Sequence, residues 1–184
     1  MAEPKPSPLE SAVQDFSGPL YSAALGLGFP PTDAEELVQD SFAGLAEALP
    51  RFEGRSSLKT YLFGILYNKA RELWRRRKRE LGLEDLEGSL DARLDARGHW
   101  LTGNGPRGPE EENLSKEVLE LITLCAEKLS LNQKAAFQLI EVEGQTREEA
   151  CNALGISDTN LRVLLHRARL GLRECLEKRW EARP

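Results

Sequence analysis

A stretch near the C-terminus combines helix-capping residues with a row of cationic and amide side chains. Residues 144–170 read GQTREEACNALGISDTNLRVLLHRARL. Thr146 and Glu149 have the spacing of a capping box, which marks the start of a helix. Gly155 stands where a helix ends in a left-handed residue, and Ser157 can cap the next helix. The pattern predicts two short helices around a tight turn, the layout of a helix-turn-helix DNA reader.

The second helix of this motif has one face suited to DNA. Arginine can form two hydrogen bonds with guanine, asparagine can do so with adenine, and both can reach phosphates. A plain helical hairpin with a solvated basic face is the alternative, and the capping and turn chemistry together favour DNA binding. The predicted apolar core across the turn consists of Ala150, Leu154, Ile156, Leu161 and Leu165, with Cys151 as the small residue where the helices approach.

A second block, residues 33–79, predicts two helices around a short loop. Thr32 and Glu35 have capping-box spacing, so the first helix should begin at about Asp33. Pro50 interrupts the pattern, and a serine at position 56 or 57 should cap a long helix that ends near residue 79. Its predicted core face is Leu58, Leu62, Ile65, Leu66 and Leu73.

Polar and basic groups gather on this loop and on the start of the following helix. A loop held between two rigid helices can hold a single nucleic-acid strand and receive an unstacked base. Phe52 either stacks on a base or fills the core, and core is the ordinary position for such a residue. The acidic outward face of the first helix, with Glu36, Asp40 and Glu47, is typical of solvated surface.

The two blocks, in this order, resemble the second and fourth conserved regions of sigma factors of the extracytoplasmic-function group of the sigma-70 family. The first block contains DAEELVQDSF at 33–42, RFEGRSS at 51–57 and LKTYLFGILYNKA at 58–70, followed by arginines. Residues 126–176 are similar to the fourth region. The resemblance implies a promoter-specificity subunit of bacterial RNA polymerase, which is not itself an enzyme and needs no cofactor or metal.

Carried over residue by residue, the resemblance implies three contact surfaces. The residues expected to contact core polymerase are Glu36, Leu37, Gln39, Asp40 and Phe42. Those expected to bind and melt the minus-ten element lie in the 50–69 loop and helix and just beyond: Arg51, Phe52, Gly54, Arg55, Ser56, Ser57, Lys59, Thr60, Tyr61, Asn68, Lys69, Arg71 and Arg75. Those expected to read the minus-thirty-five element, mostly from the 158–170 helix, are Thr146, Ser157, Asn160, Arg162, His166, Arg167 and Arg169.

This chain departs from the family pattern at two places. Most members have tryptophan where this chain has Tyr61, a smaller stacking surface. Val163 and Leu164 stand where a small polar residue and a base are frequent, which leaves the neighbouring polar residues as the expected base contacts.

Two other classes of protein fit parts of the pattern. A stand-alone repressor or activator would use the helix-turn-helix as a dimer on duplex DNA. A decoy would occupy polymerase or an anti-sigma factor without initiating transcription, but it would not need a strand-capturing loop. An enzyme fits least, because no nucleophile with a base, phosphate loop or metal cluster stands out.

Composition and charge predict an all-α protein with an acidic linker. The 184 residues are 40% hydrophobic but only 7% aromatic, and helical periodicity dominates. Residues 81–113 contain eight acidic and three basic residues, which accounts for the whole net charge of −5. The expected organisation is a disordered N-terminus (1–8), a second-region domain (9–80), a flexible linker (81–113) and a fourth-region domain (114–184). By resemblance the linker threads through polymerase. His99 and Trp100 interrupt its polarity, and we interpret them as an aromatic anchor that docks on a partner or on either domain.

The remaining features predict a cytoplasmic protein without membrane insertion. No apolar run approaches the length of a membrane span, and the first ten residues do not resemble a signal peptide. Cys125, Cys151 and Cys175 are widely separated, so we expect them to be reduced and packed, with redox sensing as the lesser alternative. The resemblance also implies a cognate anti-sigma factor as a partner.

Overall fold

A computed structural model describes residues 7–80 and 116–181, and every regular element within these ranges is helical. This confirms the all-α prediction. The expected linker at 81–113, with His99 and Trp100, and most of the expected N-terminal tail lie outside the described residues. The helices are α1 (Pro8–Gly26), α2 (Pro31–Ala48), η1 (Leu49–Arg51), α3 (Leu58–Glu80), α4 (Lys116–Ala126), α5 (Leu131–Phe137), η3 (Gln138–Val142), α6 (Arg147–Leu154) and α7 (Asp158–Glu181).

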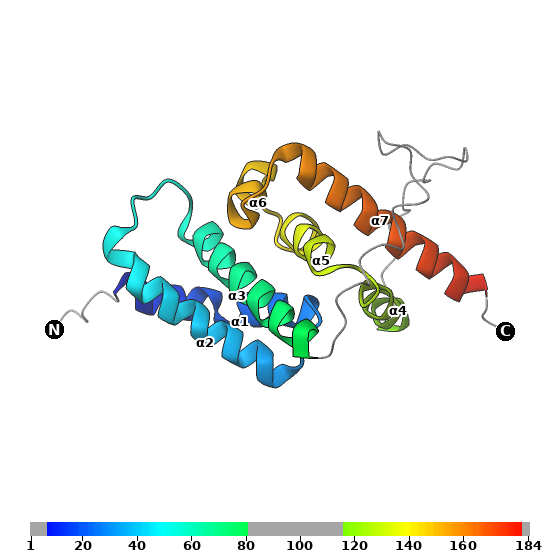
Figure 1. Ribbon diagram of the computed structural model, residues 1–184, viewed down its shortest axis with the longest axis horizontal. Coiled ribbons are helices and arrows are strands. Elements are labelled where there is room, and N and C mark those ends of the chain that lie inside the picture. Colours follow the sequence, from blue (N-terminus) through cyan, green and yellow to red (C-terminus); the bar gives the residue numbers. More distant parts are fainter. Residues whose placement is uncertain (1–6, 81–115, 182–184) are drawn as a thin grey trace.

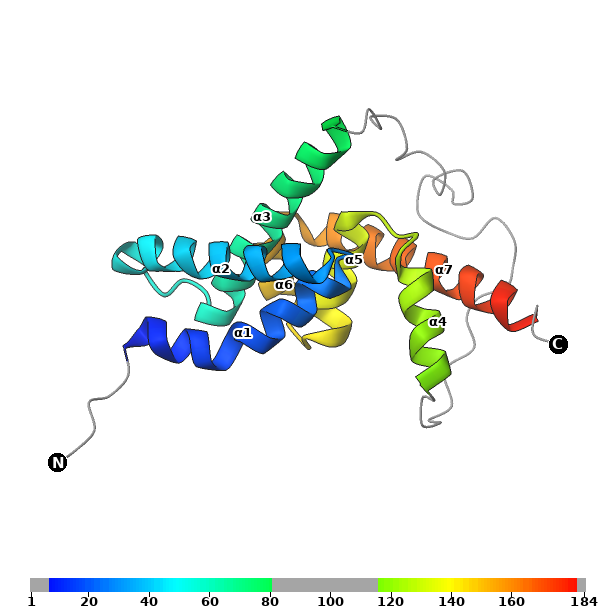
Figure 2. The ribbon, with the colours of Figure 1, turned by 90° about the horizontal axis from the view of Figure 1, so that it is seen from below.

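The first three long helices form one unit and the last four form another (Figure 1). We call α1–α3 the N-terminal unit and α4–α7 the C-terminal unit. Helices α2 and α3 pack against each other and against α1, and α5 and α7 pack together with α4 and α6 beside them. The two units meet where α6 lies on α3, which is the most extensive contact between them. Figure 2 shows the same arrangement from below.

Helix α1 was not predicted from the sequence, although its start carries a clear signal. The Ser7 hydroxyl accepts a hydrogen bond from the backbone N–H of Glu10, whose carboxylate accepts one from the Ser7 N–H. Pro8 occupies the first helical turn, where its missing N–H is harmless. These bonds to the carboxylate also lower the pKa of Glu10. The helix therefore begins inside the tail that was expected to be disordered.

Helix α2 begins two residues earlier than predicted, and the predicted capping box is wrong. Pro30 is the N-cap, and no side chain caps this end. Because Pro31 is already preset for a helix, the chain turns into α2 before Thr32 can act as a cap. The predicted faces are confirmed: Leu37 and Leu45 are buried, whereas Glu36 and Glu47 are exposed.

The predicted caps of the C-terminal unit are confirmed. Thr146 forms the predicted capping box with Glu149. Ser130 forms a second complete capping box, with Gln133. Gly155 ends α6 in the left-handed conformation with φ of 65°. The Ser157 hydroxyl accepts a hydrogen bond of 3.3 Å from the Asn160 N–H at the start of α7.

A single apolar cluster runs through both units, so they share one core. It contains Leu62 and Phe63 of α3 together with Leu139, Ala153 and Leu161 of the C-terminal unit. The predicted core residues of α3 and of the helix-turn-helix all lie in this cluster or pack against it. No described helix is both long enough and apolar enough to cross a membrane.

The structure corrects the expectation of reduced cysteines. Cys125 of α4 and Cys175 of α7 form a disulfide with a Cα–Cα distance of 5.6 Å, and Cys151 is free. The two cysteines are 50 residues apart in sequence, so only the packing of α4 on α7 brings them together.

The left-handed C-cap gives a first prediction. Gly155→Ala should lower the free energy of unfolding by about 1 kcal/mol, because a Cβ atom disfavours positive φ. Gly18→Ala is the matched control, since Gly18 lies within α1 and a Cβ atom added there would have no neighbour within 4 Å. The control should be neutral or stabilise by up to about 1 kcal/mol. Urea unfolding measures both, and equal effects of the two substitutions would contradict this explanation.

Candidate nucleic-acid interface

The loop after η1 forms a hollow lined by two aromatic rings and two arginines. Its volume is about 280 Å³. The rings of Phe52 and Tyr61 are 5.2 Å apart between centroids and tilted by 53°. Of the two positions left open for Phe52, the structure disfavours the core, because this residue is half-buried and lies outside the apolar core. The lining residues are Arg51, Phe52, Glu53, Arg55, Ser56 and Tyr61.

The local fold fixes this hollow at the start of α3. The Ser57 hydroxyl accepts a hydrogen bond of 3.0 Å from the Thr60 N–H and so caps the helix. Gly54 has φ of 69°, a value that lets the loop turn back toward Tyr61. Arg55 is exposed and pairs with the neighbouring Glu53 at 2.5 Å. The hollow thus presents π faces and positive charge together, the combination that holds an unstacked base.

The helix face beyond the hollow is covered by the C-terminal unit. Thr60 is only 2% exposed. A groove of about 200 Å³ runs between α3 and α6 and is lined by residues of both helices. From α3 and its cap come Ser56, Thr60, Tyr61, Gly64, Ile65 and Asn68, and from α6 come Asn152 and Ala153.

The contact between α3 and the C-terminal unit, which we call the junction, contains polar bonds. They occupy several residues predicted to bind the minus-ten strand. The Thr60 hydroxyl donates to Glu149 at 3.4 Å, and the Lys59 ammonium lies 3.2 Å from a carboxylate oxygen of Glu143. Lys59 also donates to the backbone carbonyl of Glu143 at 3.3 Å. Arg71 donates to the Leu154 carbonyl at the C-terminal end of α6, at 3.5 Å. These groups are therefore engaged within the protein in this arrangement.

A glycine on α3 permits the close approach of α6. A Cβ atom at Gly64 would lie 3.2 Å from the Ala153 carbonyl oxygen and 3.5 Å from the Ala153 Cα. Both atoms belong to the backbone, which cannot rotate away as a side chain could. The close contact of the two helices thus depends on the absence of a side chain at this position.

The charged carboxylate of Glu149 has two roles at this junction. Hydrogen bonds from the Thr146 backbone and hydroxyl hold the pKa of Glu149 below its usual value, with a smaller effect from Thr60. The same residue therefore caps α6 and accepts the bond from α3. Protonation at acidic pH would weaken both contacts.

The junction also contains buried polar atoms without partners. Within the described residues, neither the Tyr67 hydroxyl nor the side-chain amide of Gln145 has a hydrogen-bond partner. Burial, and secondarily the charge of Glu143, raises the pKa of Tyr67. An unsatisfied buried polar group costs about 1–3 kcal/mol, so these residues lower the stability of the closed junction.

The arginine-rich end of α3 is divided between structural and exposed positions. Arg77 pairs with the buried Asp33 of α2. Lys78 lies over the ring of Trp74 at 4.7 Å. Arg75 and Arg76 are exposed, so Arg75 remains available to bind phosphate as predicted.

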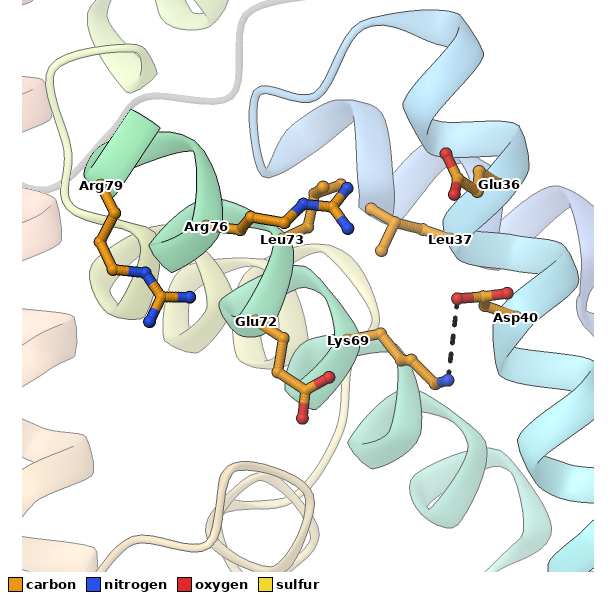
Figure 3. Close-up of a pocket in the computed structure, with 8 residues that line it drawn as sticks. All are labelled: Glu36, Leu37, Asp40, Lys69, Glu72, Leu73, Arg76 and Arg79. Atoms are coloured by element: carbon orange, nitrogen blue, oxygen red, sulfur yellow. Dashed lines mark ion pairs between the residues drawn. The ribbon is translucent and has the colours of Figure 1, made fainter. Parts of the chain in front are cut away.

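The structure places Lys69 away from the other predicted minus-ten residues. Its ammonium lies 3.7 Å from Asp40 of α2, across a groove between α2 and α3 (Figure 3). This groove has a volume of about 270 Å³ and does not include the strand-facing residues. The lining residues are Glu36, Leu37, Asp40, Lys69, Glu72, Leu73, Arg76 and Arg79.

The predicted polymerase-contact residues of α2 differ in their accessibility. Glu36, Gln39 and Asp40 are exposed. Leu37 is 3% exposed and belongs to the core, and Phe42 is half-buried against that core. The polar residues can thus contact a partner directly, whereas Leu37 mainly supports their helix.

The first turns of α7 present the predicted recognition residues to solvent. Asn160 and Arg162 are exposed, while Leu161 and Leu165 face the core. Asp158 accepts from both Arg147 at 2.6 Å and Arg162 at 2.9 Å, which holds the two arginines beside each other at the helix-turn-helix. Arg169 pairs with Glu141 at 2.5 Å.

Two predicted recognition residues are less accessible than expected. His166 and Arg167 are both half-buried. The His166 Nε2 atom is buried, and no described residue supplies a hydrogen-bond partner for it. Asn160 and Arg162 are therefore better placed for base contacts, and Thr146 and Ser157 act first as helix caps.

The fold and the site define a two-unit helical protein with a helix-turn-helix of the DNA-binding kind and an aromatic hollow beside a loop. Family models support this class directly: the model for Sigma-70 region 2 matches residues 12–80, and that for Sigma-70 region 4 matches residues 119–172. The chain belongs to the sigma-70 family and is a sigma factor of the extracytoplasmic-function type. Such proteins are non-catalytic subunits that bind core RNA polymerase and promoter DNA and direct transcription initiation.

Individual relatives agree with this assignment. The chain is 34% identical over 152 residues to the "Probable RNA polymerase sigma factor" of Haemophilus influenzae, covering 79% of this chain and 78% of the relative. It is 30% identical to the sigma factor CnrH of Cupriavidus metallidurans, covering 86% and 81%. The structure of the sigma factor RpoE of Bartonella quintana with its anti-sigma factor NepR matches with a TM-score of 0.66 and 26% identity, covering 91% of this chain and 95% of that chain.

Sequence reasoning missed the residues that join the two units. Gly64, Glu143, Asn152 and Ala153 carry no motif of their own, and no pattern within one unit reveals a contact with the other. A glycine within the apolar pattern of a long helix is the one available signal, because it often marks a close backbone approach.

The close approach at Gly64 gives a second prediction. Gly64→Leu should separate the units, because the new side chain would overlap the backbone of α6. The radius of gyration from small-angle scattering should increase, and amide exchange in α6 should accelerate. Gly18→Leu, which introduces the same side chain where nothing lies within 4 Å, should leave both quantities unchanged. An unchanged radius and exchange rate in Gly64→Leu would contradict the close contact.

Proposed function

We propose that the two units divide promoter recognition between them. The N-terminal unit, residues 9–80, would bind core polymerase and melt the minus-ten element. The C-terminal unit, residues 114–184, would read the minus-thirty-five element through the 158–170 helix. The hollow formed by Phe52, Tyr61 and the loop arginines is the observation that carries this proposal, because aromatic rings beside positive charge suit the capture of an unstacked base.

Capture of the minus-ten base follows from the chemistry of this hollow. The two aromatic rings can stack on a nucleobase, and the loop arginines can neutralise the adjoining phosphates. Thr60 and Asn68 line the adjoining groove between α3 and α6, where the following nucleotides of the strand would run. We assign Lys69 instead to the α2–α3 groove, because it pairs with Asp40 there.

Core polymerase would bind the α2–α3 groove shown in Figure 3. Its three acidic and three basic side chains, from both helices, suit a partner surface of mixed charge. Polymerase binding on this side leaves the opposite side of α3 available for the DNA strand.

DNA binding would require the C-terminal unit to leave α3, since α6 covers Thr60 and the groove beyond it. We propose that core polymerase separates the units and that a cognate anti-sigma factor favours the closed arrangement. The likeness to a sigma factor crystallised with an anti-sigma factor supports the second statement. A protein acting with bacterial polymerase on the chromosome would work in the cytoplasm.

Run-off transcription tests the proposal. Core polymerase with this protein, on a genomic fragment library, should start transcripts at promoters that share two spaced elements. Absence of such starts despite binding to polymerase would indicate a decoy, and tight binding to duplex DNA without polymerase would indicate a stand-alone regulator.

A third prediction concerns strand capture. Tyr61→Ala should reduce promoter melting by about ten- to a hundredfold, because one base–aromatic stacking contact contributes about 1–3 kcal/mol. Tyr61→Phe keeps the ring and should retain most activity. Permanganate footprinting of the minus-ten region measures melting, and equal melting by both variants would argue against stacking at this position.

A fourth prediction concerns the polymerase surface. Asp40→Arg should weaken binding to core polymerase by about tenfold, because it reverses a charge in the groove. Stability should change by no more than about 1 kcal/mol, since the Asp40–Lys69 pair is exposed. Glu47→Arg is the control, an equal change on the exposed face of α2 outside the groove. The groove would be excluded as the docking surface if both variants bound polymerase as tightly as the unaltered protein.

A further inference from the structure

The disulfide joins α4 and α7, which also pack against each other through a small apolar cluster. Cys125 of α4 is fully buried and Cys175 of α7 is 6% exposed. Around them lies a second apolar cluster, separate from the shared core, whose other buried members are Leu129, Ala168 and Leu172. Two of its five buried residues are thus the cysteines themselves.

Helix α4 depends on this small cluster for its position. Among the described elements, α7 is its principal packing partner. Leu129, just after α4, approaches Gly171 of α7 so closely that a Cβ atom there would lie 3.1 Å from its methyl group. Helix α4 is also the first described element after residues 81–115. Its packing on α7 therefore fixes the position of the first helix of the C-terminal unit.

We propose that Cys125 and Cys175 form a reversible dithiol–disulfide site whose redox state determines whether α4 remains docked on α7. This inference goes beyond promoter recognition and rests on the proposed function only for the cytoplasmic location. A disulfide in a protein that works in a reducing compartment is typically transient or redox-sensing rather than permanent. The disulfide also closes a loop of 50 residues, which is a substantial constraint on the chain. Reduction of this bond should therefore have a measurable effect on the packing of α4.

The reaction is an exchange with a small-molecule disulfide such as oxidised glutathione. One cysteine thiolate attacks the glutathione disulfide and releases one reduced glutathione, leaving a mixed disulfide. The second cysteine thiolate attacks the protein sulfur of that mixed disulfide and releases the second glutathione. The two cysteines thus lose two electrons and two protons to one glutathione disulfide, and reduction by two glutathione molecules reverses each step.

The third cysteine provides an internal control. Cys151 lies on α6, half-buried against the shared core, and forms no disulfide. Burial and the neighbouring Asp158 carboxylate raise the pKa of its thiol, which lowers its thiolate fraction. Cys151 should therefore exchange slowly with glutathione disulfide and remain a thiol in both states of the pair.

The test uses the full chain equilibrated with glutathione buffers from fully reduced to fully oxidised. Alkylation followed by mass spectrometry should count three thiols in the reduced protein and one in the oxidised protein. Hydrogen exchange in residues 116–126 should be at least about tenfold faster in the reduced state. Cys151→Ser should show the same loss of two thiols and the same change in exchange.

A double variant that lacks both cysteines separates the effect of the disulfide from any other effect of the glutathione buffer. In the variant with both Cys125→Ser and Cys175→Ser, the α4 amides should exchange at the fast rate at every glutathione ratio. In Cys151→Ser, the exchange rate of α4 should still depend on that ratio. Three alkylatable thiols at the highest glutathione disulfide concentration would overturn the proposal. Formation of the disulfide without any change in α4 exchange would overturn it as well.

Discussion

The contact of α6 with α3 is the constraint on which the rest of this structure depends. Because Gly64 has no side chain, the backbone of α6 lies directly on the face of α3 that carries Thr60 and Asn68. The same contact merges the apolar interiors of the two units into one cluster. It therefore stabilises the protein while covering part of the surface that we propose binds the DNA strand. One packing contact thus links the stability of the fold to the availability of its binding site.

The chemistry of this contact suits an interface that opens. Its polar bonds are few and long, with distances of 3.2–3.5 Å from Lys59, Thr60 and Arg71 to the C-terminal unit. Tyr67 and Gln145 are buried there without hydrogen-bond partners among the described residues, and separation would hydrate them. Three surfaces have exposed residues in the closed arrangement: the α2–α3 groove, the hollow beside Tyr61 and the start of α7. A partner can therefore engage the closed protein before the units part.

Local chemistry in the sequence was sufficient to predict most elements of the fold. The capping box at Thr146 and the left-handed Gly155 depend on residues within one turn of each other, and both were predicted. The capping box expected at Thr32 was a local error, but the errors about the site come from contacts between distant parts of the chain. The Cys125–Cys175 bond and the α3–α6 contact join residues far apart in sequence, where no spacing rule applies. Lys69 fitted the strand-binding motif, yet its position on the helix turns it toward Asp40. Residue types thus indicated the chemistry of the site, whereas packing decided which residues share a surface.

The most direct test of this account is the distance between the units with and without polymerase. Fluorophores at Glu47 of α2 and Thr159 of α7, both exposed positions, report it by single-molecule energy transfer. The free protein should show one population with high transfer efficiency, and addition of core polymerase and promoter DNA should replace it with a population of low efficiency. An unchanged distribution in an actively transcribing complex would contradict the claim that α6 must leave α3 before the DNA strand can bind.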